Sequence, residues 1–153
     1  MEVSGIPFGL MGEMLQGGGN PWRGMLFGMT ARLPWSGNPA PLWRFWDEFG
    51  MEETEMIGYW SPSCPVKTDH EDILATAYVR KDEVLVSLAS WAGEDTSCRL
   101  RIDWESLGLD RESSRLVAPA IQDFQPADSF WIKDPIPVEK GKGWLLILTD
   151  KKE

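Results

Sequence analysis

The stretch Ile73–Trp91, ILATAYVRKDEVLVSLASW, decides the fold of this chain. Apolar and small side chains alternate with others along its first half, Ile73–Arg80, and again along its second half, Val84–Trp91. A period of two places one set of side chains on one face of an extended strand. The charged residues Lys81–Glu83 join the halves, so the stretch predicts two antiparallel strands with a tight turn between them.

The segments on either side continue this pattern. We expect further strands at Met56–Trp60, Ser97–Asp103, Arg115–Ala118 and Trp144–Leu148. A proline-containing loop, with Pro126, Pro135 and Pro137, should precede the last strand. Short strands between turn signals predict a mainly β chain. Its residues 55–153 would form a C-terminal antiparallel β-sandwich, immunoglobulin-like, of about six or seven strands.

A short helix is predicted inside this sandwich. Asp103 can cap the first turn of a helix over Trp104–Leu107, because its carboxylate can accept a hydrogen bond from a free backbone N–H. Gly108 can end the helix, because glycine adopts the left-handed conformation that closes many helices.

Residues 1–54 have a different character. A loop with three consecutive glycines leads through Trp22 and Arg23 into Met25–Leu33, an apolar run that predicts a buried strand. Pro41–Phe49 then predicts a helix that ends at Gly50. A strand followed by a helix is one unit of a (β/α)8 barrel. We therefore expect the truncated end of such a barrel here, its last strand-helix unit.

The predicted helix carries one apolar stripe, at spacings of three and four residues: Leu42, Phe45, Trp46 and Phe49. A nine-residue helix does not persist alone in water. The strand and loop before it are too small to cover the stripe. We therefore expect this stripe to dock on a barrel or to mediate self-association.

Charge and composition exclude several classes of function. The chain has 24 acidic and 15 basic side chains, a net charge of −9, which disfavours nucleic acid and anionic membrane surfaces as partners. No run approaches the roughly 18 apolar residues that span a bilayer. The first residues lack the pattern of a signal peptide, so the compartment stays open, with a secreted or periplasmic parent as one interpretation. Cys64 and Cys98 could pair or stay free.

No cofactor or metal is expected. His70 is the single histidine and lies in a charged turn, which makes a catalytic triad or a zinc site improbable. Asp69, Glu71 and Asp72 lack the spacing of a calcium loop, and the triple glycine lacks the Lys-Ser/Thr of a phosphate-binding loop.

Three segments together resemble a known family. They are PFGLMGEMLQGGGNPWRGMLFGMTARLPW at 7–35, PLWRFWDEFG at 41–50 and EMIGYW at 55–60. With the sandwich that follows, they resemble the C-terminal part of glycoside hydrolase family 123 and its uncharacterised relatives. The resemblance implies an N-terminal β-sandwich, a central TIM barrel and a C-terminal β-sandwich. It makes Met25–Leu33 the last barrel strand and Pro41–Phe49 the last barrel helix.

The resemblance also implies an adjacent Asp-Glu catalytic pair, with the acetamido group of the substrate as nucleophile. That pair has no counterpart in this chain, because the adjacent Asp47 and Glu48 lie on the predicted terminal helix. No catalytic residue is therefore assigned.

Five residues are candidates for substrate contact on the barrel face where active sites gather: Glu13, Trp22, Arg23, Arg32 and Trp35. Trp22 could stack on a sugar, and Arg23 could hold a carboxylate or hydroxyl. The alternative is that Trp22 and Arg23 pin the glycine loop to the barrel rim.

The first functional hypothesis is a C-terminal fragment of a glycoside hydrolase, the accessory β-sandwich plus the barrel end, inactive alone. Whether the chain is an enzyme by itself stays open. The alternative is a non-catalytic module that binds carbohydrate or another protein through its surface. The nine tryptophans fit either core packing or a sugar-binding surface.

Overall fold

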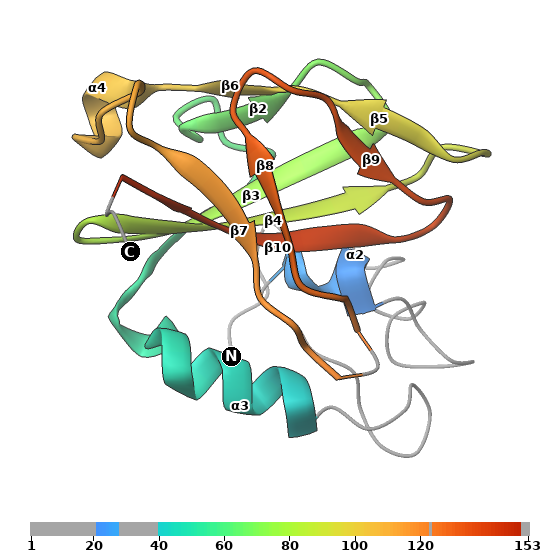
Figure 1. Ribbon diagram of the computed structural model, residues 1–153, viewed down its shortest axis with the longest axis horizontal. Helices are drawn as coiled ribbons and strands as arrows, with labels where there is room; N and C mark the ends of the chain where they lie inside the picture. Colours follow the sequence, from blue (N-terminus) through green and yellow to red (C-terminus); the bar gives the residue numbers. More distant parts are fainter. Residues whose placement is uncertain (1–20, 28–39, 123, 151–153) are drawn as a thin grey trace.

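The computed structural model describes residues 21–27, 40–122 and 124–150 (Figure 1). This part of the chain is mainly β, and all of its strand pairs are antiparallel, which confirms the predicted fold class. Figure 1 shows three layers: a large sheet across the middle, short strands above it, and helices below it.

The central sheet has six strands. In spatial order they are β1 (Glu55–Ile57), β3 (Ile73–Arg80), β4 (Glu83–Ser90), β10 (Gly143–Thr149), β7 (Arg115–Ala118) and β8 (Asp128–Trp131). The predicted hairpin supplies two of its inner strands, β3 and β4. Arg80 pairs with Glu83 across a two-residue turn, in which Asp82 adopts a left-handed φ of 71°.

Two short sheets form the layer above. In one, β2 (Val66–Thr68) pairs with β6 (Leu100–Ile102), and in the other, β5 (Thr96–Cys98) pairs with β9 (Ile136–Val138). The main core lies between these two short sheets and the central sheet. It joins Ala77, Val86 and Leu146 of the central strands to Val66 and Ile136 above them, and each of these five side chains is at most 1% exposed.

The prediction of one continuous strand over Ser97–Asp103 was wrong, because β5 and β6 are separated at Arg99. The backbone N–H of Arg99 donates to Oδ1 of Asp69 at 2.8 Å instead of joining a strand ladder. The two strands also pair with different partners. Alternation of side chains continues through such a break, so the sequence pattern did not reveal it.

The predicted proline loop also contains structure, since β8 and β9 lie within it. Pro137 is tolerated in β9 because this strand has only one partner, β5. Its carbonyl oxygen accepts a hydrogen bond from Nε1 of Trp144 at 2.6 Å. The strand is too short, and too interrupted by proline, to show a period of two.

The one-turn helix α4 (Trp104–Leu107) is confirmed with both of its caps. Oδ1 of Asp103 accepts a hydrogen bond from the backbone N–H of Ser106 at 3.1 Å. Gly108 closes the helix in the left-handed conformation, with a φ of 66°.

The first described segment is a short helix, α2 (Pro21–Met25), followed by a turn at Leu26 and Phe27. The strand predicted at Met25–Leu33 was therefore wrong for its first three residues, and its remainder lies outside the described residues. A short apolar run indicates burial but does not distinguish a buried strand from a buried helix end. Met25, Leu26 and Phe27 are indeed at most 1% exposed.

Helix α3 (Ala40–Phe49) carries the predicted stripe and packs on the lower face of the central sheet (Figure 1). Leu42, Phe45 and Phe49 are 4%, 8% and 5% exposed, and Trp46 is half-buried. The sequence led us to expect that the strand and loop before the helix are too small to cover the stripe, and it did not reveal that the central sheet after the helix covers it. The side chains of Tyr78, Leu85, Ile121 and Leu145 form an apolar surface beneath it.

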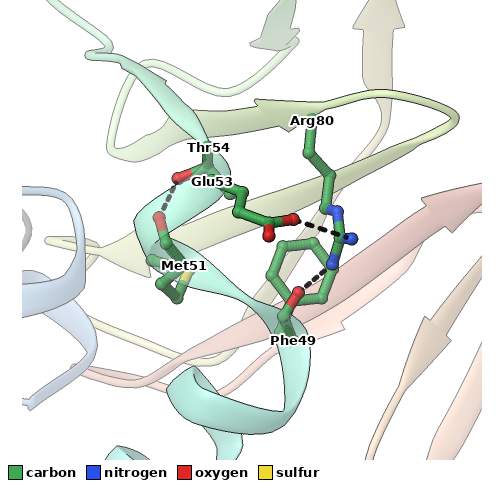
Figure 2. A network of polar contacts seen from close by, with 5 residues as sticks. All are labelled: Phe49, Met51, Glu53, Thr54 and Arg80. Carbon is green, nitrogen blue, oxygen red and sulfur yellow. Dashed lines mark hydrogen bonds and ion pairs between the residues drawn. The ribbon is translucent and has the colours of Figure 1, made fainter.

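The end of α3 is held to the sheet by Arg80 (Figure 2). Its Nη1 donates to the carbonyl oxygen of Phe49, and its Nη2 lies 3.4 Å from Oε2 of Glu53 in the 3-10 helix η1 (Met51–Glu53). Its guanidinium carbon is also 5.5 Å from the centre of the Phe49 ring. One arginine of β3 thus satisfies a helix-end carbonyl that has no partner within the helix. Docking of the stripe on a separate barrel, or self-association through it, stays a prediction.

Candidate functional site

Trp22 of α2 lies beside a small cavity at the start of β10. The cavity has a volume of about 180 Å³, and its aromatic lining comes from Trp22, Phe124 and Trp144. The ring of Trp22 stacks on that of Phe124, with centroids 4.9 Å apart and planes 26° apart. Nζ of Lys142 lies 5.8 Å from the centroid of the Trp22 ring. Much of this ring therefore already packs against the chain itself.

The Nε1–H of Trp22 is buried and has no hydrogen-bond acceptor in the described part of the chain. An unpaired buried donor costs about 1–3 kcal/mol. The cavity itself offers a wall of three aromatic side chains.

Arg23 binds the sheet directly. Its Nη2 and Nε donate to the carbonyl oxygen of Ser90 at 3.2 and 3.4 Å. Its guanidinium carbon lies 4.7 Å from the centroid of the Trp91 ring. These contacts hold α2 against the end of β4, as an anchoring role requires. Contact of Trp22 and Arg23 with a substrate stays a prediction.

The other three candidates, Glu13, Arg32 and Trp35, lie outside the described residues, so their substrate contacts also stay predictions. The structure therefore places two of the five candidates, and these two are consecutive on α2. Their side chains contact different partners: Trp22 stacks on Phe124, and Arg23 donates a hydrogen bond to the carbonyl oxygen of Ser90.

The carboxylates that the structure describes do not resemble a catalytic pair at a strand end. Asp47 and Glu48 are exposed on α3, where the sequence placed them. Nδ1 of His70 accepts a hydrogen bond from the backbone N–H of Asp72 at 3.1 Å, a contact that shapes the turn. Within 21–27, 40–122 and 124–150, no group of three or more His, Cys, Asp or Glu side chains could hold a metal ion.

Both cysteines are free and buried, which answers the question that their spacing left open. Sγ of Cys64 donates to the carbonyl oxygen of Val66 at 3.2 Å. Burial and the nearby Asp69 carboxylate raise the pKa of Cys98 to about 12. A thiol that keeps its proton at neutral pH is a poor nucleophile, so Cys98 is a core residue.

Sequence reasoning missed Phe124, Lys142 and Trp144 as neighbours of Trp22. They lie about a hundred residues further along the chain, in the loop after β7 and at the start of β10. Nothing in their local sequence indicates that contact, because only the fold brings these segments together.

In the described ranges, no helix has the length and hydropathy to cross a membrane.

Comparison with known proteins gives two matches to models of one family. The model described as the C-terminal domain of glycoside hydrolase 123 matches residues 38–149, and that of the glycoside hydrolase 123 TIM-barrel domain matches residues 1–34. The first match alone spans more than half of the chain, and it includes α3 together with the β layers. No curated protein and no solved structure matches the chain.

Proposed function

Because the chain belongs to the glycoside hydrolase 123 family, we propose that its residues serve as the accessory part of a glycoside hydrolase and are inactive alone. The accessory part is the C-terminal β-sandwich together with the end of the catalytic barrel. The observation that carries the proposal is how the two matches divide the chain. Residues 38–149 match the C-terminal domain, whereas only residues 1–34 match the barrel.

The physical argument rests on what a barrel active site needs. A (β/α)8 barrel takes about 250 residues, and its active site is built from the loops after several strands. Most glycosidases place two carboxyl groups on either side of the scissile bond, roughly 5–10 Å apart. The 34 residues that match the barrel correspond to about one strand-helix unit, which cannot surround a sugar.

A comparison of two proteins tests this proposal. The 153-residue chain and a longer version that includes the upstream coding sequence would be assayed on a panel of aryl glycosides, including N-acetylhexosaminides. We expect no hydrolysis above the buffer rate from the chain alone, and hydrolysis from the longer version if that sequence encodes the barrel. Hydrolysis by the 153-residue chain itself, retained through successive purification steps, would overturn the proposal.

The second candidate function is carbohydrate binding by the sandwich without catalysis. The observation that favours it is Trp131, which lies on β8 and is 61% exposed. An exposed indole ring is a surface on which the apolar face of a sugar can stack. Oligosaccharide-induced quenching of tryptophan fluorescence tests this candidate, and a spectrum that no oligosaccharide changes would contradict it.

A further inference from the structure

A second concave surface lies on the upper side of the molecule. A cleft of about 650 Å³ opens where β6, α4 and the end of β8 meet. Figure 1 shows β6 and α4 in the upper layer. We call this concave surface the β6–β8 cleft. Its volume is in the range of about 300–1,000 Å³ that is usual for small-molecule sites. Nε of Arg99 donates to the carbonyl oxygen of Lys133 at 3.3 Å, which ties the two walls together.

The charge of this cleft is opposite to that of the chain. Its lining includes four cationic side chains and one carboxylate, from Arg99, Arg101, Arg111, Lys133 and Glu112. The chain as a whole has a net charge of −9. A concentration of cations in one concavity creates a local positive potential, and this potential attracts anions.

Three of these four cations form no polar contact that the fold uses. Among the described residues, the side chains of Arg101, Arg111 and Lys133 form no ion pair or hydrogen bond, although the chain has a surplus of carboxylates. All three residues are exposed at the cleft. A guanidinium presents a planar fork of donors that matches a carboxylate or sulfate, so two unpaired arginines can hold such a group.

The cleft also has an aromatic side. Trp131 is 61% exposed, while Trp104 is half-buried and packs against the main core. Both tryptophans line the cleft beside the cations. A flat apolar ring next to donors for an anion is suited to a ligand with an apolar ring face and a negative substituent.

We propose that the β6–β8 cleft binds an acidic oligosaccharide, with its carboxylate or sulfate on Arg101 and Arg111 and a sugar ring on Trp131. This inference rests on the second candidate function, carbohydrate binding by the sandwich, and names its site and ligand class. Hydrolysis plays no part in it. A short acidic sugar suits the cleft better than a long polyanion does, because the net charge of −9 on the chain repels a long chain of negative charges.

The test is calorimetric titration of the 153-residue chain with four tetrasaccharides at low ionic strength. Three of them are acidic: oligogalacturonate carries carboxylates only, chondroitin sulfate carries sulfate and carboxylate, and hyaluronan carries carboxylates on sugars that alternate with acetamido sugars. The fourth, chitotetraose, carries no charge. We expect binding of the acidic sugars that weakens as salt is added, because exposed charges are screened. The ratio among the three acidic sugars shows whether carboxylate or sulfate is preferred.

Two variants locate the site, and each has a matched control. Arg101→Gln/Arg111→Gln and Trp131→Ala should each weaken binding about tenfold or more, since each removes a charge-assisted or stacking contact. Lys140→Gln and Trp43→Ala change an exposed cation and an exposed tryptophan that do not line the cleft, and they should bind like the unaltered chain. Thermal unfolding of all four variants separates loss of the site from loss of the fold.

Each outcome bears on a separate conclusion. Binding of acidic sugars that the two cleft variants lose supports the proposal. Equal affinity for polyglutamate or single-stranded DNA would overturn it, because the cleft would then be a general anion site. Binding of sugars that the cleft variants retain would also overturn it, while the carbohydrate-binding candidate would stand. Absence of binding to any sugar would overturn both.

Discussion

At the scale of the residue, Cys98 shows how burial changes the chemistry of a group. Its side chain is 2% exposed in the main core, and the Asp69 carboxylate adds a negative charge nearby. Both conditions disfavour the thiolate, the burial effect being the larger, and raise the pKa from 9.0 to about 12. We therefore expect thiol reagents to modify Cys98 only after unfolding.

This shift of the pKa predicts a pH dependence of stability. Below about pH 9 the thiol is protonated in both the folded and the unfolded chain, so it adds no pH dependence to the free energy of unfolding. Between about pH 9 and 12 the unfolded chain loses this proton while the folded chain keeps it. The free energy of unfolding should therefore fall by about 1.4 kcal/mol per pH unit from this group. Urea unfolding of the unaltered chain and of Cys98→Ala across this range measures the difference, and equal slopes for the two would contradict the prediction.

At the scale of the element, α3 shows how a short helix becomes stable. Its stripe is covered by side chains that point from the lower face of β3, β4 and β10, such as Tyr78, Leu85 and Leu145. The central sheet is thus apolar on both faces, because its upper face contributes to the main core. A sheet covered on both sides needs a helix layer, and this chain supplies that layer itself.

The burial of the stripe predicts the cost of truncating it. Phe45→Ala should lower the free energy of unfolding by about 3–5 kcal/mol, because it removes a buried ring and leaves a cavity. Trp43→Ala is the matched control on the same helix, where the ring is 48% exposed, and it should cost about 1 kcal/mol or less. Urea midpoints give both values. If Phe45→Ala left the midpoint unchanged and instead dissolved an oligomer in light scattering, the stripe would belong to an intermolecular interface.

At the scale of the whole molecule, the two cores share their strands. Ala77 faces the main core, and its neighbour Tyr78 faces α3, so one strand serves both layers. Tyr78 also bonds across layers, since its hydroxyl donates to the carbonyl oxygen of Met25. Loss of either core would expose one face of the same sheet, which couples the layers energetically.

This sharing predicts a single cooperative unfolding transition. Far-ultraviolet circular dichroism follows the strands, and tryptophan fluorescence follows the aromatic residues on both sides of the sheet. We expect both signals to change at the same temperature, as two-state unfolding requires. Trp46→Phe removes a tryptophan that packs against the α3 core and shows how much of the fluorescence change that core contributes. A fluorescence transition that precedes the circular dichroism transition would indicate that α3 separates before the sandwich unfolds.

The sequence alone determined the local features of this protein. The β3–β4 hairpin, β7, β10, α4 with its caps, and the apolar stripe of α3 were predictable, because alternation, capping residues and helical spacing act over a few neighbouring residues. The family was predictable for a different reason: the segments 7–35 and 41–60 carry distinctive motifs.

Only the tertiary structure decided which surfaces meet. It showed that Arg99 divides a strand, that the stripe of α3 is covered by the sheet of the same chain, and that Trp22 stacks on Phe124. It also brought Arg101, Arg111 and Trp131 to one cleft from three separate segments. The physical reason is that such contacts depend on long-range strand pairing and packing, whose partners are far apart in the chain and leave no local periodicity.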